Sequence, residues 1–478
     1  MTYENLQLLI DGEWRAGSEG VSEPVLNPAT EEVIGQVPHA STADLDAALA
    51  ASGTGFAIWR RTPPAERQKV MEAAARLLEE RFERIARNLT MEMGKPVGEA
   101  RQELEFAINI LRWYAEEGKR AYGRQIPARI PGVRQIAFKE PVGPALAFVA
   151  WNFPAVNVMR KVAGALGAGC SLIIKPSEET PATAVAIGRA LTDAGLPAGV
   201  LNIVFGVPAE VSEHLLASPI PRKLSFTGSV AVGKHLQKLA AATLKHCTME
   251  LGGHAPVMVF DDADISKAAR IAAGGKFRNA GQVCISPTRF LVQDSAYDTF
   301  TEVFLEEVAK IEVGNGLEDG VTMGPLVASR RLEVMDRLVQ DAVDQGATLM
   351  AGGARIGNQG SFYAPTVLGE VPATAAIMND EPFGPLAPIS RFSTLNDAVE
   401  EANRLPFGLS AYAFTSNRKT SVALTNDVAS GLLAINSLLV SSPETPFGGV
   451  LDSGYGSEGG IEGLDAFLQT RFVTETDF

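Results

Sequence analysis

The stretch ALAFVAWNFPAVNVMRKVAGALGAGCSLIIK, residues 145–175, shows the pattern that decides the fold. An apolar run is followed by a helical segment from about Ala155 and then by a second apolar run, SLIIK. The alternation continues through LNIVF (201–205) and KLSF (223–226), with Ala-rich helical segments between the runs. Short apolar strands that alternate with helices indicate a parallel, doubly wound sheet. The sequence therefore predicts an α/β fold.

A second unit of the same kind follows the first. After MELGG the chain continues with PVMVF (256–260), a helix from about Ile265, TRFLV (288–292) and a helix to about Lys310. A chain of 478 residues is too long for one compact core. We therefore expect two or three domains, with a boundary near residues 250–252.

The segments before residue 141 have patterns of their own. Apolar residues on one face predict a helix over residues 64–87, and a second helix is expected over residues 97–117. The run YGRQIPARIPGVRQIAFKE, residues 122–140, has strand-like ends around a Pro/Gly turn. This run predicts a hairpin that leaves the first domain.

The composition narrows the class of partner. Hydrophobic residues make up 46% of the chain and charged residues 21%, as in ordinary globular proteins. The net charge is −14 without any run of Lys or Arg, which argues against nucleic acid or an anionic membrane as a partner. The chain has three scattered cysteines and no zinc-ligand spacing, signal peptide or membrane-spanning run. We expect a cytoplasmic protein without disulfides or a bound metal.

Two loops that follow predicted strands are candidates for ligand binding. In FTGSVAVG, Gly228 and Gly233 frame a strand-to-helix turn whose free N–H groups can hold a phosphate. The spacing is not GxGxxG, and a plain tight turn is the alternative. In IIKPSEET, Lys175 and Glu178 follow a strand, where ligands of doubly wound sheets bind and a carboxylate can accept hydrogen bonds from a ribose. A solvated loop is the alternative there.

Two further residues have the chemistry of a catalytic pair. In MELGGHAP, Glu250 lies between an apolar strand and two glycines, where its pKa should be raised into the range of a general base. The alternative is a structural Glu with a basic partner. In FRNAGQVC, Cys284 has no histidine nearby in the sequence. It is either a nucleophile activated in another way or an inert buried thiol.

Seven stretches, taken together and in order, resemble the aldehyde dehydrogenase superfamily over essentially the whole chain. The interval of 34 residues between Glu250 and Cys284 is also the one that the family uses. The resemblance implies that Cys284 attacks the aldehyde carbonyl, that Asn152 stabilises the oxyanion, and that Glu250 activates water to hydrolyse the thioester. It thus implies NAD-dependent oxidation of an aldehyde to a carboxylic acid. The stretches are WNFP (151–154), KPSEETP (175–181), FTGSVAVG (226–233), MELGGHAP (249–256), FRNAGQVC (277–284), EPFGP (381–385) and PFGG (446–449).

The resemblance also implies a cofactor site. Ser229 and its turn would hold the pyrophosphate of NAD, Glu381 the nicotinamide ribose, and Trp151 and Phe383 would form walls. A carboxylate at Glu178 would repel the 2′-phosphate of NADP, so NAD is favoured. Lys175 and Ser177 leave NADP as the alternative.

The resemblance further implies the domain plan. Residues 1–121 and 141–250 would form a Rossmann-type NAD-binding domain, and residues 251–440 a second α/β domain that carries catalysis. Residues 122–140 and 455–478 would form a small β element that joins a homodimer or homotetramer. The chain departs from the family pattern at Leu451 and Ser457.

Three positions of the implied substrate tunnel are not the aromatics of broad-range family members. Arg160 stands there eight residues after Asn152, and Arg278 six residues before Cys284. The third is Ser441, six residues before Phe447, which would also contact the substrate. Two guanidinium groups and a hydroxyl suit a carboxylate. These motifs resemble succinate-semialdehyde and bacterial 2-oxoglutarate semialdehyde dehydrogenases. The alternatives are structural ion pairs for the arginines, a sulfonate-bearing or aryl aldehyde with a distal anion, and a non-catalytic member of the family.

Overall fold

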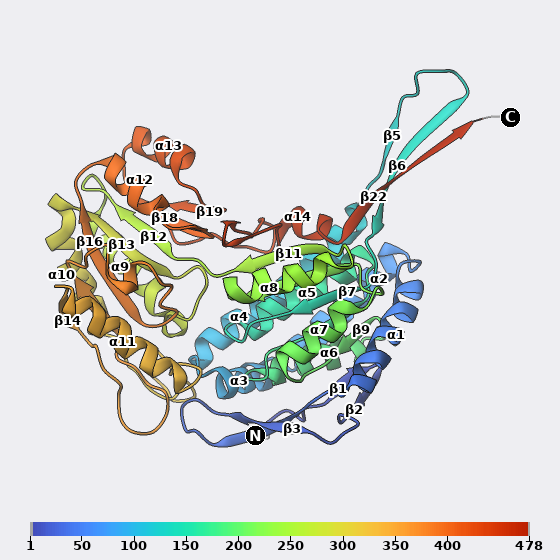
Figure 1. The fold of residues 1–478 in the computed structure, drawn as a ribbon, viewed down its shortest axis with the longest axis horizontal. Helices are drawn as coiled ribbons and strands as arrows, with labels where there is room; N and C mark the ends of the chain where they lie inside the picture. Colours follow the sequence, from blue (N-terminus) through green and yellow to red (C-terminus); the bar gives the residue numbers. More distant parts are fainter. Residues whose placement is uncertain (1–2, 477–478) are drawn as a thin grey trace.

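A computed structural model describes residues 3–476. Residues 1–2 of the expected NAD-binding domain and residues 477–478 of the expected β element lie outside this range. Two α/β lobes, each built on its own sheet, lie side by side, and a β arm projects from the first lobe (Figure 1). The predicted α/β fold class is confirmed.

The sheet of the first lobe has eight strands. Its five central strands lie in the order β9, β8, β7, β10, β11 and are parallel to one another. At each edge the next strand, β1 or β21, is antiparallel to its central neighbour. The central strands lie in the apolar runs that the sequence predicted, but ALAFVA forms a strand only to Phe148 and LNIVF only to Ile203. In spatial order the strands are β2 (Glu13–Arg15), β1 (Leu8–Ile10), β9 (Leu201–Ile203), β8 (Leu172–Lys175), β7 (Ala145–Phe148), β10 (Lys223–Gly228), β11 (His246–Leu251) and β21 (Gly454–Tyr455).

The helices of the first lobe cover this sheet and bury its apolar strands (Figure 1). The expected helix over residues 64–87 is wrong in one respect, because the chain breaks at Arg81 (φ −101°, ψ 8°) into two helices. Both pieces pack on α4 and α6, and the bend keeps each in contact with them. The helices are α1 (Thr42–Trp59), α2 (Pro64–Glu80), α3 (Phe82–Met93), α4 (Val97–Glu117), α5 (Pro154–Ala168), α6 (Pro181–Asp193), α7 (Pro208–Ala217) and α8 (Val230–Ala241).

The sheet of the second lobe has seven strands, all parallel except β14 at one edge. The chain crosses between the lobes over residues 252–254, where β11 ends and β12 begins. The strands, in spatial order, are β14 (Thr348–Ala351), β15 (Thr366–Gly369), β16 (Leu386–Phe392), β13 (Pro287–Gln293), β12 (Ala255–Val259), β18 (Ser410–Phe414) and β19 (Leu432–Ile435). The helices are α9 (Ile265–Phe277), α10 (Tyr297–Val308), α11 (Arg330–Asp344), α12 (Leu395–Asn403) and α13 (Arg418–Asp427).

The arm is a three-stranded antiparallel sheet in the order β22-β6-β5. It contains β5 (Arg124–Ile126), β6 (Val133–Pro141) and β22 (Leu468–Thr476), and it extends away from both lobes (Figure 1). Residues 455–467 differ from the rest of the expected C-terminal element, because they pack on the first lobe: α14 (Gly460–Asp465) contacts α5, and Phe467 is buried in the first core. Two small two-stranded sheets complete the fold, β3 (Ser22–Leu26) with β4 (Val33–Pro38) and β17 (Phe407–Gly408) with β20 (Val450–Leu451).

Over residues 3–476, none of the helices combines the length and the hydropathy needed to cross a membrane. The same part of the chain contains no cluster of three His, Cys, Asp or Glu side chains that could hold a metal ion.

Candidate active site

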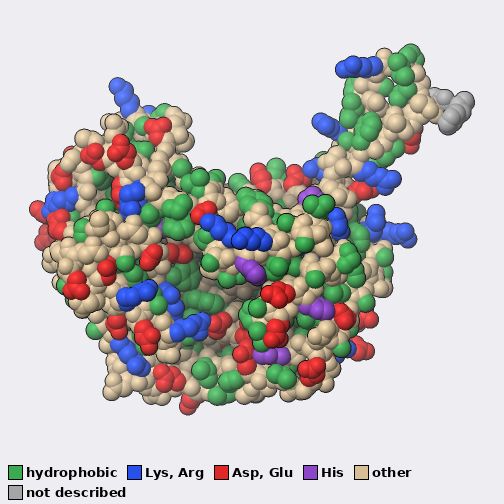
Figure 2. All heavy atoms as spheres, viewed as in Figure 1, with side chains coloured by type: hydrophobic (Ala, Val, Ile, Leu, Met, Phe, Trp, Pro, Cys, Tyr) green, Lys and Arg blue, Asp and Glu red, His purple; other side chains and the backbone are tan. Residues whose placement is uncertain are grey.

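A cavity of about 1120 Å³ lies between the two lobes. Figure 2 shows it as a hollow with apolar side chains inside and charged side chains at its rim. Every site residue predicted from the sequence lines this cavity except Gly233. A Cβ atom at Gly233 would lie 2.4 Å from the Leu251 side chain, so this glycine allows α8 to approach β11 closely.

The loop that carries Cys284 is tightly constrained. It begins with Asn279 and Ala280 in the left-handed region (φ 51° and 52°), which L-residues adopt only when the surroundings impose it. A Cβ atom at Gly281 would lie 2.1 Å from the Gly384 oxygen, so only glycine fits between the two loops. The Gln282 side chain accepts a hydrogen bond from the Val327 N–H at 2.9 Å. The thiol of Cys284 therefore has a defined position at the cavity.

Burial, together with the carboxylates of Glu381 and Glu250, raises the pKa of the Cys284 thiol to about 12. The charge of Arg160 opposes this rise. Without a bound cation the thiol is thus protonated at neutral pH. The nearby His254 does not act on it, because its two ring nitrogens lie 2.8 Å from Thr288 Oγ1 and 3.0 Å from the Ile377 oxygen.

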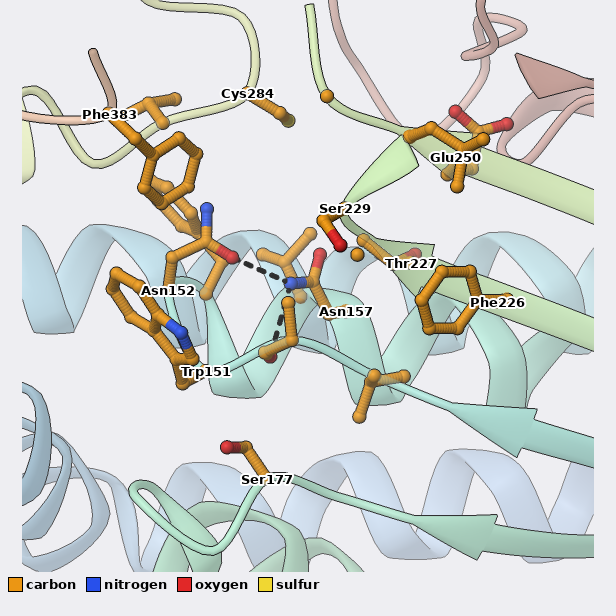
Figure 3. A pocket seen from close by; sticks show the side chains of 18 of the residues that line it. Trp151, Asn152, Asn157, Ser177, Phe226, Thr227, Ser229, Glu250, Cys284 and Phe383 are labelled. Carbon is orange, nitrogen blue, oxygen red and sulfur yellow. Dashed lines mark hydrogen bonds between the residues drawn. The ribbon is translucent and has the colours of Figure 1, made fainter. Parts of the chain in front are cut away.

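Glu250, at the end of β11, is a buried carboxyl group on the opposite side of the same space (Figure 3). Neither of its oxygens has a hydrogen-bond partner within residues 3–476. Burial raises its pKa well above the ordinary range, the charge of Glu458 raises it further, and Lys161 and Arg160 lower it. Lys161 instead pairs with Glu458. Glu250 is therefore a buried carboxyl group that holds its proton more tightly than an exposed glutamate does.

Asn152, between β7 and α5, is held by hydrogen bonds at both ends of its amide. Its Nδ2 donates to the Gln282 oxygen at 3.1 Å, and its Oδ1 accepts from Asn157 Nδ2 at 3.3 Å. An Asn amide has two N–H donors, so one remains available. Figure 3 shows the amide nitrogen on the side of the pocket where Cys284 lies.

The far end of the cavity carries the residues predicted to bind the dinucleotide. Ser229 caps α8 by accepting from the Val232 N–H at 3.5 Å, and the first turn of this helix borders the cavity. Glu178 pairs with Lys175 and also accepts from the Gly206 N–H at 3.3 Å. Ser177 donates to Glu179.

Two residues at this end were missed by the sequence reasoning. Glu179 forms an ion pair with Arg330, which belongs to the second lobe. No local pattern marks this contact, because the two residues are 151 positions apart. Both residues line the cavity, so their ion pair joins the two lobes at its border.

Between the two ends lie Trp151, Phe383 and Glu381. The two aromatic rings meet edge to face with centroids 5.5 Å apart. Glu381 accepts a hydrogen bond from the Gly253 N–H at 3.3 Å. Burial raises its pKa to about 8, although this hydrogen bond and the charges of Arg331 and Lys276 act in the opposite direction. A Cβ atom at Gly252 would lie 2.4 Å from the Glu381 carboxylate, so the chain leaves room for this group.

The end of the cavity nearest the predicted substrate tunnel brings Arg160, Ser441 and Phe447 together. Arg160 Nη2 donates to Ser441 Oγ at 2.8 Å, and its guanidinium lies 4.1 Å from the centre of the Phe447 ring. Arg160 Nη1 is buried and has no partner within residues 3–476. An unpaired buried donor of this kind costs free energy until a ligand accepts its hydrogen bond.

Arg278 lines the same cavity but is not in contact with this cluster. It is exposed, and its guanidinium lies 5.0 Å from the centre of the Phe153 ring. Over the described residues, neither Arg278 nor Arg160 forms an ion pair. Further apolar side chains that the sequence did not single out line the tunnel: Phe106, Phe153, Leu438, Leu439 and Val440.

The departures from the family pattern lie at the edge of this region. Leu451 is exposed in β20 with a positive φ of 57°, and it does not line the cavity. Glu458, which follows Ser457, lies at the cavity beside Glu250 and accepts a hydrogen bond from Ser225 Oγ at 3.0 Å.

A thiol, a buried carboxyl group and a large cleft between two α/β lobes are the features expected of a cofactor-dependent oxidoreductase. The model of the aldehyde dehydrogenase family matches residues 14–473. This chain belongs to the aldehyde dehydrogenase family.

Relatives match over the whole length. A 4-(hydroxymethyl)benzenesulfonate dehydrogenase from Comamonas testosteroni is 46% identical, over 98% of both chains. The NADP-dependent succinate-semialdehyde dehydrogenase of Escherichia coli is 39% identical, over 98% of this chain and 97% of the relative. The crystal structure of succinate-semialdehyde dehydrogenase from Burkholderia pseudomallei is 38% identical, with a TM-score of 0.98 over 99% of this chain and 98% of that one.

Members of this family are enzymes that oxidise aldehydes with NAD or NADP, and a solved relative contains bound NAD⁺. The predicted family, the enzymatic class and the NAD(P) dependence are therefore confirmed.

Proposed function

We propose that this protein oxidises an aldehyde with a distal carboxylate, such as succinate semialdehyde or 2-oxoglutarate semialdehyde, to the dicarboxylic acid. The observation that carries the proposal is the unpartnered Arg160 Nη1 beside the Arg160–Ser441 hydrogen bond. A carboxylate there accepts charge-assisted hydrogen bonds, which are about twice as strong as neutral ones. Arg278, exposed at the cavity, adds attraction for the anion at longer range.

The reacting groups have complementary roles. Cys284 attacks the carbonyl carbon, forming a C–S bond, and the remaining N–H of Asn152 with the Cys284 main-chain N–H stabilises the oxyanion. One such donor contributes about 3 kcal/mol of transition-state stabilisation. NAD⁺, when bound, supplies the hydride acceptor of the oxidation and a positive charge that favours the thiolate. Glu250 then takes a proton from the water that hydrolyses the thioester.

The residues of the cavity suit a dinucleotide. The open first turn of α8, with Ser229 and Gly228, suits a pyrophosphate. The space above Gly252 leaves room for Glu381 to meet the nicotinamide ribose. Trp151 and Phe383 would flank the ring, and Lys175, Ser177 and Glu178 would meet the adenosine ribose. Because the carboxylate of Glu178 disfavours a 2′-phosphate, NAD is the preferred cofactor.

Both lobes contribute residues to the proposed cofactor and substrate sites. We assign residues 1–121 and 141–250 to cofactor binding, although Glu250 and Asn152 act in catalysis from there. Residues 251–440 supply Cys284 and Arg278. The cavity thus uses both lobes at once.

A sulfonate-bearing aryl aldehyde is the second candidate substrate. Its support is the 46% identity to a benzenesulfonate dehydrogenase and the apolar wall formed by Phe106, Phe153 and Leu439. A sulfonate, like a carboxylate, accepts hydrogen bonds from a guanidinium.

The arm supports assembly into a homodimer or homotetramer. Its strand β22 has one unpaired edge, and Ile130 and Phe472 are 64% and 54% exposed. Open strand edges and exposed apolar side chains are features of surfaces that pair with another chain.

A substrate panel tests the proposal. Initial rates of NADH formation would be compared for succinate, glutarate and 2-oxoglutarate semialdehydes, 4-sulfobenzaldehyde and hexanal. We expect kcat/KM to be highest for a carboxylate-bearing aldehyde. Hexanal as the best substrate would reject the anion site, and 4-sulfobenzaldehyde as the best would select the second candidate.

A further inference from the structure

Lys95 is a buried lysine directly beside the segment that carries Asn152. It follows Gly94 in the turn between α3 and α4, and it is 1% exposed. Its ammonium group donates to Glu103 and to the main-chain oxygen of Asn152, the latter at 2.9 Å. It also lies 3.9 Å from the centre of the Phe153 ring. A charge removed from water in this way persists only with such partners.

Glu103 extends the contact of Lys95 to two main-chain N–H groups further along the segment. One of its oxygens accepts from the Ala155 N–H at 2.8 Å and from the Val156 N–H at 3.4 Å, in the first turn of α5. A negative charge is favourable at the N-terminus of a helix. The Lys95–Glu103 pair therefore holds the main chain from Asn152 to Val156 at both ends.

The Cys284 loop contacts the same carbonyl group. Asn279 Nδ2 donates to the Asn152 oxygen at 3.0 Å and to the Gln282 oxygen at 3.2 Å. Gln282 also accepts the Asn152 side-chain N–H. Asn152 is thus connected to Lys95 on one side and to the loop of Cys284 on the other.

The turn that carries Lys95 is held in place because its backbone packs directly on the backbone of the second lobe. The Val97 N–H donates to the Gly316 oxygen at 2.9 Å. A Cβ atom at Gly324 would lie 2.0 Å from the Gly94 oxygen, and one at Gly316 would lie 2.5 Å from the Lys95 oxygen. The position of the Lys95 ammonium is therefore set by close backbone packing.

We propose that Lys95, with Glu103, is a positioning residue that aims the free N–H of Asn152 at the substrate oxygen as negative charge develops on it. The proposal rests on the oxyanion role proposed above for Asn152. A buried ion pair contributes little net stability, since desolvation offsets its attraction. If two apolar side chains of the same size replaced Lys95 and Glu103, three hydrogen bonds would be lost. One goes from Lys95 to the Asn152 carbonyl, and the other two go from the main chain at the start of α5 to Glu103.

Two cofactor-free reactions of Cys284 separate this role from a general structural one. In acylation by 4-nitrophenyl acetate, sulfur bonds to the carbonyl carbon, negative charge develops on its oxygen, and 4-nitrophenolate leaves. In alkylation by iodoacetamide, sulfur displaces iodide and no oxyanion forms. An aimed Asn152 amide accelerates the first reaction alone.

The expected result for Lys95→Met is a slower acylation, by up to about 100-fold, since misplacing a reacting group by about 1 Å has costs of this size. The alkylation rate stays unchanged. In the Asn152→Ala background, Lys95→Met adds no further slowing, because two residues that act through one group are not additive. Lys245→Met is the matched control and changes neither rate: Lys245 is also buried and donates to a main-chain oxygen, that of Ser218 at 2.7 Å, outside the cavity.

Equal slowing of both reactions by Lys95→Met, or full additivity with Asn152→Ala, would overturn the inference. If Asn152→Ala slows acylation while Lys95→Met does not, the inference fails and the oxyanion role stands. If Asn152→Ala leaves acylation unchanged, the oxyanion role itself fails. Should Lys95→Met not fold, Glu103→Gln takes its place, with the same selective slowing expected and unchanged acylation as the overturning result.

Discussion

The contribution of Arg160 to substrate binding leads to a quantitative prediction. Arg160→Met keeps an unbranched side chain against Phe447 but removes the charge and the unpartnered Nη1 donor. A hydrogen bond to a charged group contributes about 1.5–3 kcal/mol. Since each 1.4 kcal/mol is a factor of ten, KM for succinate semialdehyde should rise about 10- to 150-fold.

The exposed Arg278 is the matched comparison. An exposed ion pair contributes about 0.2–1 kcal/mol, so Arg278→Met should raise the same KM only about 1.5- to 5-fold. The difference follows from burial, because water screens the charge of Arg278 but not that of Arg160.

The assay is steady-state formation of NADH with succinate semialdehyde and hexanal side by side. Hexanal uses the same Cys284 but lacks the anion, so it corrects for any effect of the lost charge on Cys284 and Glu250, whose pKa values Arg160 lowers. A rise of KM that is equal for the two aldehydes would refute the reasoning and make Arg160 a packing residue.

Three further predictions concern the thiol, the base and the cofactor. Because the pKa of Cys284 is about 12 in the cofactor-free protein, alkylation by iodoacetamide should be slow at pH 7, rise with pH beyond 10, and become faster at pH 7 when NAD⁺ is added; a plateau below pH 9 without NAD⁺ would contradict the burial argument. Glu250→Gln should release one NADH per active site and then stop, since the thioester is not hydrolysed, and undiminished steady turnover would exclude Glu250 as the base. In the unaltered enzyme, hydrolysis should accelerate as pH rises through the raised pKa of Glu250, because the base acts only when deprotonated. Glu178→Ser should raise the ratio of kcat/KM for NADP over NAD by about tenfold, the effect of removing roughly 1 kcal/mol or more of like-charge repulsion; an unchanged ratio would show that Glu178 does not face the 2′ position.

Two neighbouring carboxyl groups at the cavity have different surroundings. Glu458 is paired with Lys161 and accepts a hydrogen bond from Ser225, so its charge is compensated. Glu250 has no hydrogen-bond partner within the described residues, and burial and the charge of Glu458 raise its pKa. These surroundings are the ones that the proposed role of Glu250 as a base requires.

The placement of the site between lobes has a structural consequence. Asn152 and Glu250 come from the first lobe and Cys284 from the second. The close packing of Gly281 on Gly384 and the hydrogen bond from the Val327 N–H to the Gln282 side chain hold the Cys284 loop in place. Changes at these buried loop contacts should therefore affect catalysis without touching a reacting group.

The sequence predicted several strands and one helix start correctly, because these features depend on residues that are close together in the chain. The apolar runs that became β7, β8 and β10 have the length and composition of buried parallel strands, and Pro154 stands at the first position of α5, where proline is favoured. The motif residues Cys284, Glu250 and Asn152 were recognisable from motif order, and all three line one cavity.

Other features depended on which segments meet in space. The sequence alone assigned the same role to Arg160, buried with a free donor beside Ser441, and to Arg278, exposed over Phe153, because burial depends on segments that meet only in the fold. The break at Arg81 was hidden because the apolar period runs on through the bend. The ion pair between Arg330 and Glu179 joins residues 151 positions apart, which no sequence motif connects.

By itself, the sequence determined the alternation of strands and helices and, through the resemblance of its motifs, the family. The alternation is set by side-chain periodicity and turn chemistry, which act over a few residues. The tertiary structure alone decided which of Arg160 and Arg278 is buried at the cavity, and that Lys95 reaches the Asn152 carbonyl. Burial and charge compensation depend on chain segments brought together from distant parts of the sequence, and the free energy of a buried charge is a property of all its neighbours together.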